Sequence, residues 1–217
     1  NLHGKSGKIL IAVNDDIETA NPDAILWAMA FRSRPHLDMQ ILPHRGPGHG
    51  PSDHARGDED SALLVDALPE KLGSEVADLG AGWGFLSAHA LTRPDIKNLY
   101  LVEAGHMALE CARRNVTDDR ASFAWEDATS WEPPHRMDSV IMNPPFHIGR
   151  AAEPQIGQAF VATAARILSP QGKLWMVANR HLPYEAELKT RFAHVEEIGG
   201  DARFKLFHAA RPLRKRR

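Results

Sequence analysis

Apolar residues recur with two different periods along the chain, and these periods predict its secondary structure. From Ser74 onward, short runs rich in β-branched and aromatic residues alternate with stretches whose apolar positions recur every three or four residues. The short runs predict strands at 75–80, 98–103, 121–127, 138–143 and 173–179, then a closing pair at 194–199 and 203–210. The longer stretches predict helices at 61–68, 85–91, 106–116, 154–168 and 184–192, with a turn at 169–172. Strands that alternate with helices predict an α/β fold with a mostly parallel, doubly wound sheet.

The first sixty residues predict a separate, smaller part of the chain. A strand at 8–14, a helix at 21–31 and a strand at 39–43 form a small βαβ segment, followed at 43–60 by a Gly-, Pro- and charge-rich linker. We therefore expect two parts, an N-terminal segment with its linker at 1–56 and a larger domain at 57–217. The larger domain ends in the basic tail "RPLRKRR".

The composition is that of an ordinary globular protein. It limits the cellular locations and binding partners to be expected. The 217 residues are 43% hydrophobic and 25% charged. No apolar run is long enough to cross a bilayer, so no membrane partner is expected. The single cysteine, Cys111, excludes an internal disulfide and favours a cytoplasmic location. The net charge of −2 does not indicate a nucleic-acid binder; the basic tail fits a solvated terminus, which charge alone favours, or a contact with phosphates.

The histidines do not predict a metal site. None of the twelve shows the spacing of a metal-binding motif. His44, His49 and His54 lie in the predicted linker, where a solvated loop is the expected state. We therefore expect no metal ligand in this chain.

A glycine-rich loop follows the strand at 75–80. "DLGAGWG" places Gly80, Gly82 and Gly84 between this strand and the next helix, where glycine permits a tight turn and close approach of a ligand to the backbone. The G-x-G-x-G spacing differs from that of dinucleotide sites, and no G-K-[ST] is present to hold a triphosphate. A loop that only packs tightly is the alternative.

Two acidic residues stand at the ends of the next two predicted strands. Glu103 ends the second strand, where a carboxylate can accept hydrogen bonds from both hydroxyls of a ribose. Asp127 ends the third, where a carboxylate can accept from the amino group of adenine. Each acid alone is equally typical of a cap or a solvated side chain.

Together and in this order, the loop and the two acids resemble the class I S-adenosylmethionine-dependent methyltransferases. The resemblance implies a Rossmann-like fold with a seven-stranded, mostly parallel sheet, a closing antiparallel strand pair, and S-adenosyl-L-methionine as cofactor. In that family the first loop surrounds the methionine part, the second-strand acid binds the ribose and the third-strand acid meets the adenine. The implied cofactor site comprises Asp78, Gly80, Ala81, Gly82, Glu103, Asp127, Ala128 and Asn143.

The stretch "NPPF" at 143–146 matches the [D/N/S]-P-P-[F/Y/W] motif of amino-methylating enzymes. An exocyclic amine is a poor nucleophile because its lone pair is delocalised into the ring. The side-chain oxygen of Asn143 and the carbonyl of Pro144 can accept its two N–H bonds and free the lone pair, while Phe146 can stack on a flipped base. The prolines hold these catalytic groups rigid. A plain Asn-Pro turn is the alternative.

Longer stretches resemble a narrower family. "NPPFH", "VANRHLPYEAELKTRF" (177–192) and "RFKLF" (203–207) resemble the ribosomal RNA guanine-N2 methyltransferases of the small-subunit type, over about 61–212. This implies ribosomal RNA or a ribosomal subunit as partner. The base pocket would then be lined by Pro145, His147, Arg180, Leu182 and Tyr184. A capping or surface role is the alternative for His147.

Two other functions stay open on the sequence. One is methylation of a protein glutamine, because the same acceptor pair suits any planar nitrogen. The other is a non-catalytic RNA-binding or assembly module with a vestigial cofactor site; the intact Glu103 and Asn143 argue against it.

The front of the chain resembles a different family. Residues 8–60 are similar to a C-terminal fragment of the UbiD-type decarboxylases, which use a prenylated flavin. The part of that family that holds the flavin and the catalytic residues has no counterpart here, so we infer no decarboxylase chemistry. The chain is therefore expected to be a composite joined near 58–68.

Overall fold

A computed structural model describes residues 59–145, 147–148, 151–152 and 154–214. The chain divides into two units between Gly57 and Asp58, and the described residues belong to the second. The elements predicted at 8–14, 21–31 and 39–43 lie outside the described residues, as does most of the predicted linker. Its last two residues contradict the prediction, because Glu59 and Asp60 form the first turn of a helix. Acidic side chains are favourable at that position, where the helix dipole is positive.

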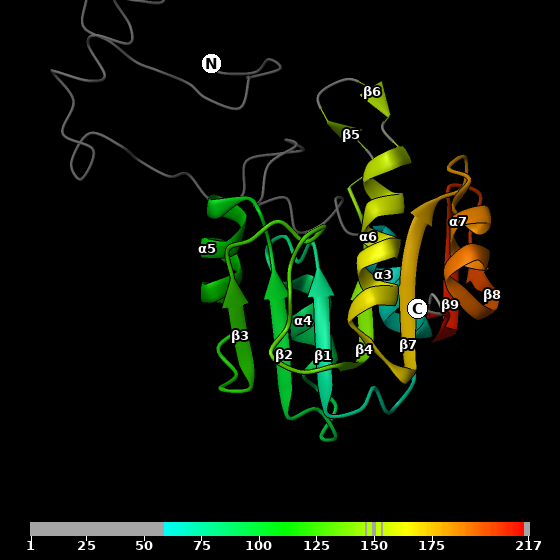
Figure 1. Cartoon of the computed structure of the whole chain (residues 1–217). Coiled ribbons are helices and arrows are strands. Elements are labelled where there is room, and N and C mark those ends of the chain that lie inside the picture. Colours follow the sequence, from blue (N-terminus) through cyan, green and yellow to red (C-terminus); the bar gives the residue numbers. More distant parts are fainter. Residues whose placement is uncertain (1–58, 146, 149–150, 153, 215–217) are drawn as a thin grey trace, which may run out of the picture. The chain divides into compact units, whose positions relative to one another are not determined.

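A seven-stranded sheet in the order β3-β2-β1-β4-β7-β9-β8 forms the centre of the described unit (Figure 1). The first five pair in parallel, and β9 and β8 close the sheet as antiparallel strands. The expected seven-stranded, mostly parallel sheet with a closing pair is confirmed. The strands are β1 Glu75–Leu79, β2 Asn98–Val102, β3 Ala121–Ala124, β4 Met137–Met142, β7 Leu168–Asn179, β8 Phe192–Gly200 and β9 Phe204–Pro212.

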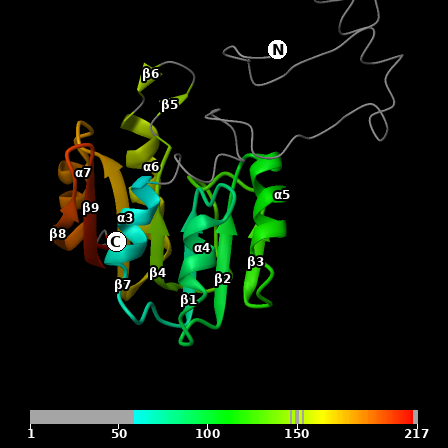
Figure 2. The same cartoon turned by 180° about the vertical axis from the view of Figure 1, so that it is seen from behind.

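Helices cover both faces of the sheet, so β1 and β4 are buried on both sides, as their continuous apolar runs predict. Figure 2 shows α3, α4 and α5 on one face, and Figure 1 shows α6 and α7 on the other. Two apolar clusters fill the two interfaces, with Ile141 and Trp175 in one and Val140 and Met142 in the other. The helices are α3 Glu59–Ala67, α4 Phe85–Ala90, α5 His106–Asn115, α6 Pro154–Ile167 and α7 Tyr184–Arg191.

Three local features differ from the predicted elements. β3 ends at Ala124, three residues early, because Trp125 leaves the sheet and donates its ring N–H to the carbonyl of Ala104, 2.9 Å away. The turn predicted at 169–172 lies inside β7, whose first residue, the buried Leu168, pairs with Met137 across an irregular register. The third difference is an unpredicted two-stranded ladder, β5 His147–Ile148 and β6 Ala151–Ala152, after the NPP segment.

Candidate functional site

The strand order brings the predicted cofactor and catalytic residues to one edge of the sheet. From β1 the chain continues to β2 and β3 on one side, then returns to place β4 on the other. Leu79 at the end of β1 pairs with Val102 of β2 and with Met142 of β4. The ends of β1, β2 and β4 are therefore adjacent (Figure 1), and the glycine loop, Glu103 and Asn143 directly follow them in the sequence. Open α/β sheets bind ligands at such a reversal of strand order.

The three glycines of the loop all adopt left-handed backbone conformations but have different surroundings. The φ angles are +74° at Gly80, +57° at Gly82 and +91° at Gly84. A Cβ on Gly84 would lie 2.8 Å from the side chain of Val116, so this glycine permits close packing. A Cβ on Gly82 would meet nothing within 4 Å. Gly82 is therefore the position where the backbone is open to a ligand.

The base of the loop is fixed on both sides. The N–H groups of Gly80 and Ala81 donate to the carbonyl of Val102 over 2.9 and 3.1 Å. A Cβ on Gly80 would lie 3.0 Å from the ring of Phe160 and 3.9 Å from Pro145. The glycine loop and the NPP segment are thus neighbours, and Phe160 of α6 packs beneath them.

Glu103 is held by two backbone donors and keeps capacity for more. Its Oε2 accepts the N–H of Gly82 at 2.8 Å, and its Oε1 accepts the N–H of Gly105 at 2.6 Å. A carboxylate has about four acceptor positions, so two remain on an oriented, half-buried group. Two adjacent hydroxyls, as on a ribose, fit this arrangement.

Asp78 lies on β1, fully buried under the loop. The hydroxyl of Ser87 donates to its Oδ2 at 2.7 Å, whereas its Oδ1 has no hydrogen-bond partner among the described residues. Burial raises the pKa of Asp78 to about 7; the hydrogen bond from Ser87 opposes this and the charge of Glu103 adds to it. A cationic group bound above the loop would stabilise the ionised form of this carboxyl.

Asp127 and Ala128 follow β3 beside these groups. The Oδ1 of Asp127 accepts both the N–H and the hydroxyl of Thr129, each at 2.8 Å, which fixes the turn. Its Oδ2 takes no hydrogen bond from the described part of the chain and is exposed. Ala128 is buried. The exposed oxygen is available to an amino group.

The Asn143 side chain is oriented by α3. Its Nδ2 donates to the Oδ2 of Asp60 at 2.8 Å and to the Oγ of Ser61 at 3.0 Å. Its Oδ1 takes no hydrogen bond within the described residues. Pro144 is buried and Pro145 is exposed. Asn143 therefore presents an unused acceptor beside the glycine loop.

For two predicted residues, one at the end of the NPPF stretch and one just after it, the side chain is outside the described set. Phe146 lies outside the described residues. The backbone of His147 belongs to β5, but its side chain is outside the described set. Their assignments as stacking and pocket residues stay predictions.

The remaining predicted pocket residues have contacts within the described fold, and their assignment to the base pocket stays a prediction. Arg180 donates to the carbonyls of Asp201 and Phe204 at 2.8 and 3.1 Å and pairs with Glu197. Leu182 and Tyr184 lie in the core. The Tyr184 hydroxyl is buried and has no hydrogen-bond partner in the part of the chain that the structure describes, and burial raises the pKa of this group. No hydrogen bond or ion pair in the described part of the chain joins these three residues to Asn143.

Sequence reasoning missed Asp60 and Ser61. Both precede Asn143 by more than eighty residues. Asp60 is the last residue of the predicted linker, and Ser61 is the first residue of the helix predicted at 61–68. Their only local signal is an acid followed by a serine at a helix start, which is common for reasons of capping. Their role depends on where α3 packs.

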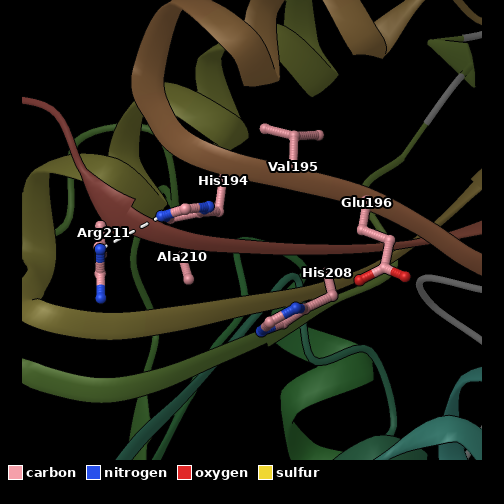
Figure 3. Close-up of a pocket in the computed structure, with 6 residues that line it drawn as sticks. All are labelled: His194, Val195, Glu196, His208, Ala210 and Arg211. Atoms are coloured by element: carbon pink, nitrogen blue, oxygen red, sulfur yellow. Dashed lines mark hydrogen bonds between the residues drawn. The ribbon is translucent and has the colours of Figure 1, made fainter.

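A separate hollow lies on β8 and β9, at the far edge of the sheet (Figure 3). Within it, Arg211 donates to the Nε2 of His194 over 3.3 Å, and His208 stacks on Trp175 with ring centroids 4.3 Å apart. It contains none of the predicted site residues. The lining residues are His194, Val195, Glu196, His208, Ala210 and Arg211.

The described residues show neither a metal centre nor a membrane-spanning helix. They contain no group of three or more His, Cys, Asp or Glu arranged to hold a metal ion. None of their helices has the length and apolar character needed to cross a membrane.

Two protein-family models match the chain. The family described as "Methyltransferase small domain" matches residues 52–208. The family described as "3-octaprenyl-4-hydroxybenzoate carboxy-lyase C-terminal domain" matches residues 1–67. Both resemblances found in the sequence are thus confirmed, and the two matches overlap at residues 52–67.

Individual relatives cover the same part of the chain. The ribosomal RNA large subunit methyltransferase G of Shewanella amazonensis is 38% identical over 156 residues, 69% of this chain and 40% of that protein. The ribosomal RNA small subunit methyltransferase C of Hahella chejuensis is 32% identical over 159 residues, 72% of this chain and 46% of that protein. The chain therefore spans less than half the length of these curated relatives.

Solved structures agree with the fold. The 16S rRNA N2 G1207 methyltransferase of T. thermophilus, in complex with AdoMet and guanosine, is 27% identical with a TM-score of 0.60. The match covers 73% of this chain and 45% of that one. The N-methyltransferase NodS of Bradyrhizobium japonicum, 14% identical with a TM-score of 0.56, covers 74% of this chain and 99% of that one, and shows the fold alone. The expected Rossmann-like methyltransferase fold is confirmed.

Proposed function

Because the chain belongs to the methyltransferase small domain family, we propose that it transfers a methyl group from S-adenosylmethionine to guanine N2 of ribosomal RNA. One observation carries this proposal: Glu103, the open Gly82 and Asn143 stand on adjacent strand ends, each with unused capacity for a ligand. The T. thermophilus neighbour, described with AdoMet and guanosine, supports this choice of cofactor and base.

Each part of the cofactor has a group in the site that fits it. Glu103 accepts the ribose hydroxyls with the acceptor positions that Gly82 and Gly105 leave free. The exposed oxygen of Asp127 accepts from the adenine amino group beside Ala128. Gly80, Ala81 and Gly82 would hold the methionine part, with the carboxyl of Asp78 buried under the loop. When bound, the cofactor supplies an electrophilic methyl group on a sulfonium that keeps its electron pair on leaving.

The chain's own residues prepare the methyl acceptor. The Oδ1 of Asn143 accepts one N–H of the amine and the carbonyl of Pro144 accepts the other, which localises the lone pair on nitrogen. That lone pair forms the new N–C bond, and one amine proton passes to solvent. Rigid, preorganised acceptors of this kind are usually the largest contribution to catalysis. Phe146 and His147 enter only through the resemblance, as residues that stack on and line the base pocket.

Nucleoside analysis by mass spectrometry tests the proposal. Unmodified ribosomal RNA, incubated with the protein and S-adenosylmethionine, should yield N2-methylguanosine, and RNA without protein should yield none. A release-factor protein treated in parallel tests the alternative, glutamine methylation. Methylglutamine without any methylated nucleoside would overturn the RNA assignment. No methyl transfer to either, together with no cofactor binding by calorimetry, would favour the non-catalytic RNA-binding module.

We also propose that the activity resides in residues 57–217, independently of residues 1–56. The division between Gly57 and Asp58 and the family match that starts at residue 52 support this boundary. A chain that lacks residues 1–56 should fold and bind the cofactor like the full chain. An insoluble or non-binding product would place the boundary elsewhere. Ribosomal RNA as partner is consistent with the expected cytoplasmic location.

A further inference from the structure

We propose that Asp60 and Ser61 are positioning residues that hold the Asn143 amide with its oxygen toward the methyl-accepting amine. The inference rests on the function proposed above and deepens it. Both residues stand in the first turn of α3 and are buried, with exposed fractions of 7% and 5%. Neither belongs to the glycine loop, the two strand-end acids or the NPPF stretch.

The two contacts from α3 use both hydrogens of the amide. The Nδ2 of Asn143 lies 2.8 Å from the Oδ2 of Asp60 and 3.0 Å from the Oγ of Ser61. An ionised carboxylate can only accept, so the amide nitrogen must face Asp60. The carbonyl oxygen of Asn143 then accepts no hydrogen bond from the described residues. An amine needs an acceptor there, whereas a flipped amide would present N–H groups to N–H groups.

Asp60 is itself held in place. Its Oδ1 accepts the backbone N–H of Ser61 at 2.8 Å, which leaves Oδ2 aimed at Asn143. The neighbouring Glu59 takes no part in this contact and pairs with Arg203 at the surface. The orientation of Asn143 is therefore imposed by a helix that lies more than eighty residues earlier in the chain.

This contact explains why the first motif position is asparagine in this chain. The motif also permits aspartate, whose carboxylate would still accept from the amine. Here an aspartate at 143 would place an oxygen where Nδ2 now stands, 2.8 Å from the Oδ2 of Asp60. Two carboxylates at that distance repel or share a proton. Asparagine at 143 and aspartate at 60 thus form a matched donor and acceptor.

Exchanging the two residue types provides the sharpest test. Asn143→Asp alone should lower turnover at saturating cofactor about a hundredfold. Asp60→Asn alone should lower it about tenfold, because an NH2 donor then replaces one of the two oxygens that accept separately from Ser61 and Asn143. In the double variant the amide at 60 keeps its oxygen on the N–H of Ser61 and donates to the carboxylate at 143. Turnover should then rise at least about tenfold above that of Asn143→Asp.

Glu59→Gln is the matched control. It removes the same charge from the adjacent residue of the same helix but touches Arg203 rather than Asn143. We expect turnover within about twofold of the original protein, and the same cofactor dissociation constant in all five proteins. A double variant no better than Asn143→Asp would overturn the proposal. So would a loss in Glu59→Gln equal to that in Asp60→Asn.

A second measurement separates this inference from the proposed function. In the nuclear magnetic resonance spectrum, both side-chain amide protons of Asn143 should exchange slowly with water, and Asp60→Asn should make them exchange faster. If the original protein is inactive on RNA, the proposed function fails, while this measurement still decides the orientation. Equal exchange rates in the original protein and Asp60→Asn would overturn the positioning role.

Discussion

β4 carries a polar side chain near each of its ends, and the two differ in how much of their hydrogen-bonding capacity the fold uses. Near the start of the strand, the Oδ2 of Asp138 accepts the N–H and hydroxyl of Ser74 and the N–H of Glu75, at 2.8, 3.2 and 3.1 Å. Just past the other end, Asn143 uses its two donors and leaves its oxygen open. Asp138 thus stabilises the fold through hydrogen bonds, whereas Asn143 presents an acceptor to a ligand.

The same difference separates the two edges of the sheet. At the amino edge, Arg120 donates to the carbonyls of Arg93 and Ile96, and Asp95 accepts the N–H of Gly73. At the carboxyl edge, Glu103 and Asp127 are oriented by backbone groups but keep acceptors free. Polar groups at the amino edge therefore stabilise the loops that lead into the strands. Those at the carboxyl edge keep acceptors that can bind a ligand. Substitutions at the two edges should have different effects.

Asp78 is the strongest test, because it lies at the carboxyl edge yet is fully buried. Its pKa in the folded protein, about 7, is above the ordinary value of 3.8. As pH rises, the unfolded chain loses this proton first, so stability from this group is full below about pH 4 and is lost up to about pH 7. The loss is about 4 kcal/mol. Asp78→Asn should remove this pH-dependent change in stability.

Urea unfolding between about pH 4 and 8 measures this effect. The free energy of unfolding of Asp78→Asn, relative to the original protein, should rise steadily across this range and level off above about pH 7. Ser87→Ala, which removes only the hydroxyl donor to Asp78, serves as the control and should keep a pH dependence. Identical pH slopes for Asp78→Asn and the original protein would show that Asp78 is ionised in the folded state.

Asn143→Ala sharpens the comparison at the far end of β4. Removal of one preorganised acceptor should lower turnover about 10²–10³-fold, or about 3–4 kcal/mol of activation free energy. The cofactor dissociation constant should hardly change, because the other strand ends supply its contacts. Steady-state turnover per folded molecule and calorimetry give the two values. Turnover equal to that of the original protein would mean that the NPPF stretch is only a turn.

Asp138→Ala, at the start of β4, should lower stability and leave turnover unchanged. It removes three hydrogen bonds to a charged group and should lower the free energy of unfolding by about 3 kcal/mol. Turnover per folded molecule and cofactor affinity should stay unchanged. Glu110→Ala is the matched control, since its exposed pair with Arg113 should contribute less than about 1 kcal/mol. An Asp138→Ala variant that keeps full stability but loses turnover would contradict the division of roles between the amino edge and the carboxyl edge.

Sequence alone predicted those parts of the molecule that depend on local pattern. Strands and helices follow from their periods, and Glu103 could be placed near the glycine loop because parallel strands end at one edge. The contact of Asp60 with Asn143 could not be predicted, because it depends on how α3 packs against strands far along the chain. Tyr184 also illustrates this limit: its burial against α6, where Gly157 leaves room for its hydroxyl, depends on how two helices pack.

Titration of S-adenosylmethionine into the original protein, Glu103→Ala and Glu110→Ala by calorimetry tests the central claim most directly. The hydrogen bonds from a ribose to the Glu103 carboxylate should be worth roughly 1.5–3 kcal/mol. We therefore expect Glu103→Ala to weaken binding by about tenfold to a hundredfold, while Glu110→Ala binds like the original protein. An unchanged dissociation constant for Glu103→Ala would contradict the assignment of the carboxyl edge as the cofactor site.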